Sequence, residues 1–357
     1  MKINIKKEQM SKNERWDALL NRQKLDRIPV YAFAHGFCGK HAGLSLAEVY
    51  GAPEKTFNAI TEVSDKFGWQ DLPIICYAAT GAWEFGGEVK MPKSEFDQAP
   101  KVVRRPVQNI EDIGQIQVPD VRTAGIYPLA FELSKLQAAD PNNLIMVQVT
   151  GPWSLACNIC GMENIARWAI KDPGLVHSIQ EKILPFSINV LKHWVQTFGS
   201  NRILPWIGGT ATANNTLISP KVFETLVLPY MKKLYDAAHE MELKHIYIHI
   251  CGEQNKNLPF WAELNYGNPG ILSFGAEVSL ETAGKMFPDD IIMGNIDTTT
   301  MLSEKPEKVY AETIKTIESG MKCNGGFMLA PGCEMPPMTP EENIWALMQA
   351  VSDVGWY

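Results

Sequence analysis

The chain has 357 residues, of which 45% are hydrophobic and 20% charged, and its formal net charge is -7. This length and composition can bury a large core, and an acidic chain without a basic block lacks the electrostatic footprint of a nucleic-acid-binding protein. No segment reaches the length of a membrane span and the charged N-terminus has no apolar signal-like core, so we expect a cytoplasmic protein without membrane contact.

Short β-rich runs alternate with longer helical patterns along most of the chain. Seven runs are predicted strands: Ile28–Phe33, Leu144–Val149, Arg202–Ile207, Ile246–Ile250, Gly270–Phe274, Asp290–Gly294 and Gly326–Ala330. Most intervals leave room for a crossover helix, which is typical of a parallel sheet. Ser219-Pro220 and Thr339-Pro340 each combine a capping residue with a proline and predict helix starts. With an eighth strand hidden, the pattern favours an α/β fold, a (β/α)8 TIM barrel over residues 1–357 with an N-terminal extension; a doubly wound sheet is the alternative.

The segment from 71 to 120 does not follow this alternation. It is rich in Gly and Pro and contains Gly81-Ala-Trp-Glu-Phe-Gly-Gly87 and Lys101-Val-Val-Arg-Arg-Pro106. We expect an inserted β-rich segment, a meander or lid, instead of a barrel repeat.

A histidine and two cysteines follow apolar runs. His249 and Cys251 close a predicted strand, and Cys333 follows a later one. Residues i and i+2 of a strand point to the same side, and the strand ends of a barrel meet at one rim. One imidazole and two thiolates suit zinc and leave a coordination position open for chemistry. The alternative is a polar strand end with an unrelated loop cysteine.

Seven cysteines, an odd number spread along the chain, argue against a disulfide framework. Cys157 and Cys160 have the spacing of redox and zinc motifs, but they lie at a predicted helix start. Core packing is the favoured interpretation, because a buried free cysteine behaves as a small hydrophobe.

Several motifs resemble the uroporphyrinogen decarboxylase superfamily, and within it the zinc-dependent, corrinoid-linked methyltransferases. The resemblance covers most of the chain, and the specific part is His249-x-Cys251 with the late Cys333. The supporting segments are Leu25-Asp-Arg-Ile-Pro-Val30, Thr150-Gly-Pro-Trp-Ser-Leu155, Leu217-Ile-Ser-Pro-Lys-Val-Phe223, Gly294-Asn-Ile-Asp297 and Thr339-Pro-Glu-Glu-Asn343.

The resemblance implies a barrel with Zn²⁺ held by His249, Cys251 and Cys333. Glu277 is either a fourth ligand when substrate is absent or the start of a helix. The superfamily's decarboxylases carry an arginine-bearing segment after the first strand, whereas this chain reads Tyr31-Ala-Phe-Ala-His-Gly-Phe-Cys-Gly-Lys40. The missing arginines oppose porphyrinogen decarboxylation, which remains an alternative, because acidic porphyrin side chains need cations.

In such methyltransferases zinc either activates a thiol that accepts a methyl group from a methyl-Co(III) corrinoid, or polarises a methyl donor that Co(I) attacks. The chain has no Asp-x-His-x-x-Gly pattern, so the corrinoid (cobalamin) is expected on a partner protein. A homodimer is left open, as is a non-catalytic protein with structural zinc.

Aromatic residues at predicted loops and strand ends favour a flat donor, an aryl methyl ether, as the first hypothesis for O-demethylation, with methyl transfer to a thiol as the alternative. The candidate pocket residues are Tyr31, Phe33, Trp83, Trp153, Trp206 and Phe274.

Four further polar residues lie near predicted strand ends. His35 is a candidate for protonating the departing oxygen or orienting substrate. Asn295 and Asp297 are candidates for binding substrate or supporting His249, and Asn214 is a weaker candidate for substrate binding. Each is alternatively a plain structural or capping residue.

Overall fold

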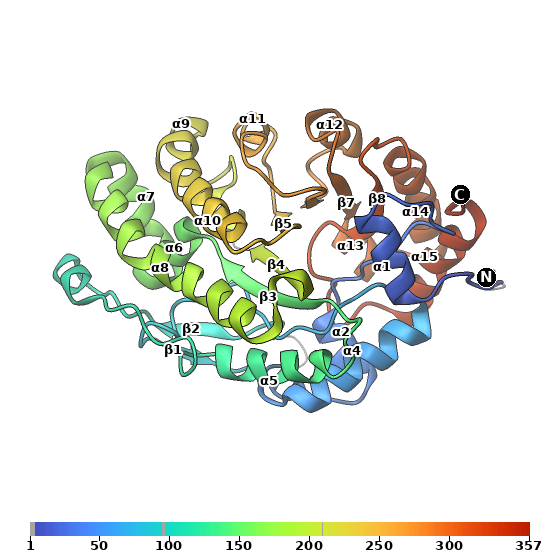
Figure 1. Ribbon diagram of the computed structural model, residues 1–357, viewed down its shortest axis with the longest axis horizontal. Helices are drawn as coiled ribbons and strands as arrows, with labels where there is room; N and C mark the ends of the chain where they lie inside the picture. The colour runs from blue at the N-terminus through green and yellow to red at the C-terminus, as the bar shows by residue number, and fades with distance from the viewer. Residues whose placement is uncertain (1–3, 95–96, 209) are drawn as a thin grey trace.

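The computed structural model describes residues 4–94, 97–208 and 210–357. Its centre is a six-stranded parallel sheet whose strands neighbour each other in chain order (Figure 1). The strands are β3 (Ile145–Thr150), β4 (Ile203–Gly208), β5 (Tyr247–Ile250), β6 (Ile271–Phe274), β7 (Ile291–Ile296) and β8 (Phe327–Pro331). Nearly every strand residue is buried because helices cover the outer face and side chains fill the inner one. Six of the seven predicted strands are confirmed with small boundary shifts.

Two extended segments, 28–33 and 72–77, lie where the first two strands of a barrel would be; we call them the first and second barrel positions. The amide of Leu329 in β8 donates to Pro29 O, and the Tyr31 amide donates back to Leu329 O, both at 2.9 Å. The Gln70 amide then donates to Val30 O at 2.7 Å. The predicted strand at 28–33 therefore lies beside β8 as expected. Its hydrogen bonding is too irregular for a regular β-strand, since Pro29 has no amide hydrogen to donate. These two segments and the six-stranded parallel sheet confirm the predicted barrel fold class.

The predicted insertion at 71–120 needs a correction. Residues 72–77 are buried and lie in the barrel wall, where the Gln148 side chain of β3 bonds to both the amide and the carbonyl of Tyr77 at 3.2 Å. This stretch is the hidden strand position, masked by Pro73. The remainder holds a two-stranded antiparallel hairpin, β1 (Glu88–Lys90) and β2 (Lys101–Arg104), and a 3-10 turn at Ile110–Gln115.

Helices follow most strands and form the outer layer (Figure 1). The predicted helix start at Ser219-Pro220 is confirmed, since Ser219 Oγ accepts from the Val222 amide; the helix passes through a π turn (Phe223–Val227) into α10. The remaining helices are α1 (Lys12–Leu20), α2 (His35–His41), α3 (Leu46–Gly51), α4 (Pro53–Phe67), α5 (Tyr127–Ala138), α6 (Pro152–Cys160), α7 (Met162–Lys171), α8 (Pro173–Phe198), α9 (Pro220–Val222), α10 (Leu228–Glu240), α11 (Leu258–Trp261), α12 (Leu280–Met286), α13 (Thr298–Ser303), α14 (Pro306–Gly320) and α15 (Glu341–Val354).

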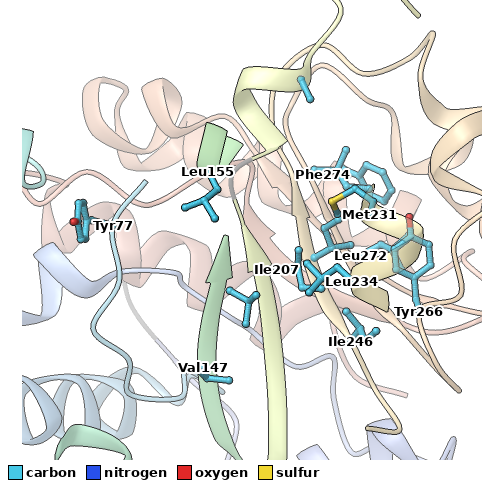
Figure 2. Packing of buried hydrophobic residues seen from close by; sticks show 14 of the residues in the cluster. Tyr77, Val147, Leu155, Ile207, Met231, Leu234, Ile246, Tyr266, Leu272 and Phe274 are labelled. Atoms are coloured by element: carbon cyan, nitrogen blue, oxygen red, sulfur yellow. The ribbon is translucent and has the colours of Figure 1, made fainter. Parts of the chain in front are cut away.

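The core has two layers separated by the sheet. The outer layer joins strands to helices, as Figure 2 shows for Ile207, Leu272 and Phe274 beside Met231 and Leu234 of α10. The inner layer fills the barrel and includes Trp16, Ala18, Leu19 and Leu20 of α1 as well as inward-facing strand residues. Cys157 and Cys160 are buried in the outer layer, which confirms the core interpretation.

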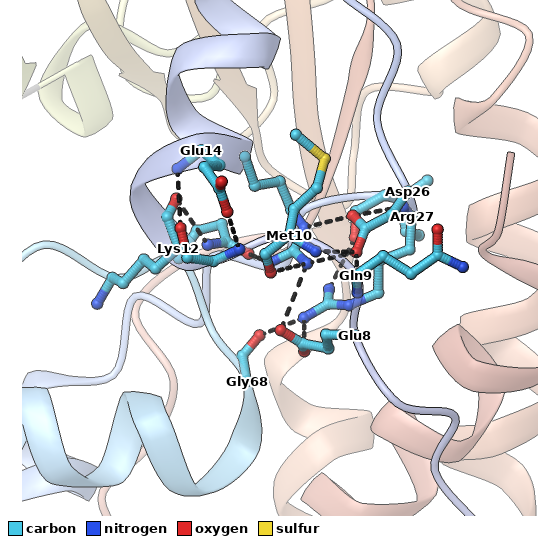
Figure 3. A network of polar contacts seen from close by, with 12 residues as sticks. Glu8, Gln9, Met10, Lys12, Glu14, Asp26, Arg27 and Gly68 are labelled. Carbon is cyan, nitrogen blue, oxygen red and sulfur yellow. Dashed lines mark hydrogen bonds and ion pairs between the residues drawn. The ribbon is translucent and has the colours of Figure 1, made fainter.

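The N-terminal extension closes the end of the barrel at which the strands begin. Arg22, just after α1, bonds to Asn268 Oδ1 and Asp289 O, which precede β6 and β7. An ion network fixes the extension: the buried Arg15 pairs with the buried Asp26 at 2.8 Å. The buried Arg27 pairs with the partly exposed Glu8 (Figure 3). The opposite rim is left for the candidate site. None of the helices in the described ranges is long and apolar enough to cross a membrane.

Candidate metal centre

His249, Cys251 and Cys333 converge at the rim where the strands end. His249 lies in β5, Cys251 directly follows it, and Cys333 follows β8. Their ligand atoms all lie within 4.8 Å of one another, and the two sulfurs are 3.8 Å apart. Among the residues that the structure describes, the buried Nε2 atom of His249 has no hydrogen-bond partner, and the cluster has no fourth protein ligand. One imidazole nitrogen and two sulfurs fit the donor set of a zinc site with an open position.

The orientation of His249 is set by the neighbouring strand. The β5–β6 register places His249 opposite Ser273, and Ser273 Oγ lies 3.0 Å from His249 Nδ1. Engaging Nδ1 leaves Nε2 as the nitrogen that faces the cysteines. Such a partner on the remote nitrogen is the usual means of fixing a metal-binding imidazole.

The loop after β4 holds the backbone of the His-x-Cys segment. Thr210 Oγ1 donates to His249 O at 2.6 Å and accepts from the Cys251 amide at 2.9 Å. The fully buried Gln254 donates to Cys251 O and to Thr210 O. Gly252 turns the chain with φ of +76°, and a Cβ there would lie 3.0 Å from Asn214 Nδ2, so only glycine fits this turn.

The two cysteines have opposite pKa shifts because their thiols interact. The hydrogen bond between them, with a smaller contribution from His249, lowers the pKa of Cys333 to about 4. The same bond, followed by burial and the charge of Cys333, raises the pKa of Cys251. A thiolate at Cys333 is thus favoured, as metal ligation requires.

Of the predicted pocket residues, Phe33 lies against the centre, and Trp206 packs on Phe33. The Phe33 ring centroid is 5.5 Å from that of His249 and 5.1 Å from that of Trp206, in edge contacts. Both rings belong to the inner layer of the core. They form an apolar wall beside His249.

His35 begins α2 next to this wall and is buried. Its Nδ1 is 3.8 Å from Cys76 Sγ and 3.8 Å from Glu334 Oε1. Burial lowers the pKa of His35 to about 4, so its imidazole is neutral at neutral pH. Burial and the neighbouring Cys333 raise the pKa of Glu334 to about 8.

Four predicted pocket residues lie elsewhere. Phe274 packs against Phe287 on the outer face of the sheet, because Ser273 takes the inner face and neighbours alternate. Trp153 is buried in α6 and donates to Thr212 O at 3.0 Å. Trp83 packs on the outer core, and Tyr31 lies one layer deeper in the barrel, with its hydroxyl 3.4 Å from Met146 Sδ. These four are corrected to core residues.

The predicted polar residues Asn295, Asp297 and Asn214 have structural partners. Asn295 Nδ2 donates to Gly275 O and Val278 O, and Asp297 is the exposed N-cap of α13, accepting from the Thr299 amide. Neither supports His249, whose partner is Ser273. Asn214 lies beside Gly252 but accepts from the Thr216 amide and donates to Ala211 O.

Glu277, the candidate fourth ligand, is exposed and does not belong to the three-residue cluster. Its Oε2 lies over Gly275, 2.5 Å from where a Cβ there would be. Its charge contributes to the raised pKa of Cys251, so it stands near the centre without joining it.

Sequence reasoning missed Ser273, Thr210, Gln254 and Glu334. Ser273 is the polar residue in an otherwise apolar strand, and this was a signal of an inward role. Its pairing with His249 depends on strand register, which the sequence does not reveal. Glu334 directly follows Cys333, and its position next to a predicted ligand was a signal that it lies near the site.

Comparisons with known proteins agree with this geometry. A family model described as uroporphyrinogen decarboxylase (URO-D) matches residues 11–354. The methylcobamide:CoM methyltransferase MtbA of Methanosarcina mazei is 25% identical over 345 residues, 95% of this chain and 97% of that protein. The uroporphyrinogen decarboxylase of Coxiella burnetii is 24% identical over 364 residues, 96% and 95% of the two chains.

A solved methyltransferase from Methanosarcina mazei has the same fold, with a TM-score of 0.79 at 22% identity over 96% of this chain and 98% of that one. The relatives bear out the expected enzyme of the corrinoid-dependent methyltransferase type. Because the family model spans nearly the whole barrel, including the ends of the two strands that carry His249, Cys251 and Cys333, the chain belongs to the uroporphyrinogen decarboxylase (URO-D) family.

Proposed function

We propose that this chain is a zinc-dependent methyltransferase that passes a methyl group from a methyl-Co(III) corrinoid protein to a thiol. The observation that carries the proposal is the cluster of His249, Cys251 and Cys333, with an unpartnered Nε2 at the barrel rim. Relatives over almost the full length are named methylcobamide:CoM methyltransferases, which supports this direction over the aryl ether that the sequence favoured.

The donor set supports zinc as the metal of this proposal. Imidazole with two thiolates is a zinc combination, and oxygen-preferring ions such as Mg²⁺ do not suit it. When bound, the metal supplies a positive charge that lowers the pKa of a substrate thiol at its open position.

The chain's own residues prepare this position. Ser273 keeps His249 Nε2 directed at the cysteines, and Thr210 fixes the backbone between the two β5 ligands. Phe33 presents an apolar ring beside His249, and Trp206 packs on that ring. His35, neutral because of its low pKa, is suited to orient the substrate and not to act as an acid.

The aromatic wall also favours a second candidate. A phenyl methyl ether could stack on Phe33 and Trp206 while Co(I) of the partner attacks its methyl carbon. In this case the metal would stabilise the departing phenolate oxygen.

A spectrophotometric assay separates the two candidates. The purified chain is mixed with a methyl-Co(III) corrinoid protein and a panel of thiols that includes CoM, and separately with a Co(I) corrinoid protein and methoxybenzenes. Thiol-dependent loss of methyl-Co(III) supports the proposal, and ether-dependent gain of methyl-Co(III) supports the second candidate. Neither change, with zinc present, contradicts both.

The metal is tested by Cys333→Ala, with Cys323→Ala as the matched control. Cys323 is also a partly buried thiol, but it contacts Leu280 O and lies outside the cluster. Cys333→Ala should lose zinc and methyl transfer together while keeping the fold, and Cys323→Ala should keep both. Full activity of a zinc-free Cys333→Ala chain would refute the site.

A further inference from the structure

Asp71 is a buried carboxylate directly before the second barrel position, with 2% exposure. It accepts a hydrogen bond from the Ala32 amide at 2.5 Å, and the backbone amides of Phe33 and Ala34 favour its charged form by lowering its pKa. The carboxylate is therefore bonded to the residue that precedes Phe33. Ala32, Phe33 and Ala34 belong to the turn that leads from the first barrel position into α2.

The middle residue of this turn has an unusual backbone conformation. Phe33 has φ of +47°, in the left-handed region that a residue with a Cβ rarely adopts. Such a conformation persists only where the surroundings hold it. The chain just before Phe33 is held by the hydrogen bond from the Ala32 amide to Asp71 at 2.5 Å. The Met335 amide, which donates to Phe33 O at 2.9 Å, holds the carbonyl side of Phe33.

Both sides of Phe33 reach the metal-binding cluster. Its ring contacts His249, with centroids 5.5 Å apart, and its carbonyl binds Met335, two residues after Cys333. The ligands of β5 and of the loop after β8 thus share one neighbour. A change in the backbone of Phe33 would release the ring and the loop at once.

A second buried carboxylate shows that accepting backbone amides does not by itself link a residue to the cluster. Glu84, 4% exposed, accepts from the Gly81 amide at 2.5 Å and the Ile126 amide at 3.1 Å, and from the Tyr77 hydroxyl. These partners tie the segment after the second barrel position to the start of α5. Glu84 is therefore a matched control for burial and amide bonding.

We propose that Asp71 is a positioning residue for the metal centre: it holds Phe33 in the left-handed conformation that places its ring on His249 and its carbonyl on the loop that carries Cys333. The inference rests on the metal-binding cluster of the proposed function but not on the direction of methyl transfer. It extends the site to a buried residue directly before the second barrel position, outside the cluster of His249, Cys251 and Cys333.

Hydrogen–deuterium exchange on the full chain tests the proposal without any assay of activity. Asp71→Asn keeps the shape but replaces an acceptor by an amide group that faces backbone donors. Exchange of the Met335 amide and its neighbours in 333–338 should accelerate roughly tenfold, because a buried hydrogen bond has lost its support. Glu84→Gln should leave this segment unchanged, and Co²⁺ titration should show weaker thiolate charge-transfer binding for Asp71→Asn alone.

Phe33→Gly separates positioning from general stabilisation, because glycine adopts a positive φ without strain. Asp71→Asn should accelerate exchange clearly less in the Phe33→Gly chain than in the parent chain. If Asp71→Asn alone does not fold, rescue of folding by Phe33→Gly gives the same support. Equal acceleration in both backgrounds, unchanged exchange and Co²⁺ binding, or failure of both variants to fold would overturn the proposal. Failure of methyl transfer with intact Co²⁺ binding would contradict only the proposed function.

Discussion

Ser273 supports a candidate metal ligand with its side chain, through the contact from its Oγ to His249 Nδ1 at 3.0 Å. Its backbone belongs to β6, which packs rigidly between two neighbours. The hydroxyl can therefore be removed without disturbing the strand.

Ser273→Ala should weaken zinc binding by about 10- to 100-fold, the range found when such supporting partners of metal ligands are removed. Competition with a chromophoric chelator measures the affinity. Ser134→Ala is the control, since Ser134 is also buried but bonds to Trp194 Nε1 and Ala130 O. Unchanged zinc affinity in Ser273→Ala would show that the contact between Ser273 Oγ and His249 Nδ1 has no role in metal binding.

His35 should make stability depend on pH. Its pKa falls from 6.5 to about 4 on folding because of burial, so between these values the unfolded chain binds a proton that the folded chain rejects. The contribution, roughly 3 kcal/mol, is complete above about pH 6.5 and is lost as pH falls toward 4. The groups that face the imidazole are Glu334 and Cys76.

Urea unfolding of the parent chain and of His35→Gln between pH 4.5 and 7 measures this dependence. Asp71 makes stability depend on pH in the opposite direction. Burial raises the pKa of folded Asp71 to about 6, so its contribution to the free energy of unfolding falls as pH rises toward that value. It is present in both chains, so it cancels in their difference. The parent chain should gain more stability with rising pH than His35→Gln, and parallel curves would contradict the assignment.

At the scale of elements, the ends of β4 and β5 are joined by Thr210. Its hydroxyl accepts the Cys251 amide and donates to His249 O, so one side chain satisfies two backbone groups where regular pairing between the strands has ended. Backbone groups buried without partners are costly, and this bridge lets the metal-binding segment leave the sheet.

Thr210→Val keeps the shape and removes both bonds. We expect a loss of about 1–3 kcal/mol in the free energy of unfolding, because a buried amide and a carbonyl lose their partner. Thr313→Val on α14 is the control, as its hydroxyl bonds only to Val309 O of its own helix. Urea unfolding compares the two, and an equal effect of both changes would argue against a special role for the β4–β5 bridge.

At the scale of the whole molecule, the two ends of the barrel have separate tasks. Helix α1 inserts Trp16 into the inner core at the end where strands begin, and Trp16 Nε1 donates to Gln70 O at 2.9 Å. The candidate metal cluster lies at the opposite end. The packing of α1 and the candidate site thus lie at different ends of one core.

Trp16→Ala should lower the free energy of unfolding by about 3–5 kcal/mol, as expected for removing a buried aromatic side chain. Zinc bound per folded chain should not change. Urea unfolding and metal analysis on the same sample measure both quantities. A loss of zinc from folded Trp16→Ala would show that the two ends are linked more tightly than the packing indicates.

The sequence by itself determined the order of strands and helices, the helix starts at prolines, and the His249-x-Cys251 pair with Cys333. These features are local or follow from a two-residue strand period and from the rule that barrel strand ends meet at one rim. The same local rules missed the second barrel position, because Pro73 and the irregular hydrogen bonding of residues 72–77 disguise it as a loop.

Only the tertiary structure decided which neighbours the ligands have. Whether Ser273 or Phe274 faces the centre depends on the register between β5 and β6, and a shift of one residue would exchange them. The sequence also does not predict the left-handed backbone of Phe33, because the residue there is not a glycine. The nearby hydrogen bond from the Ala32 amide goes to Asp71, which is distant along the chain. His249 and Cys251 were readable because their spacing is local, and Cys333 because barrel strand ends meet at one rim. The residues that support them are brought together by contacts between segments that meet only when the barrel closes.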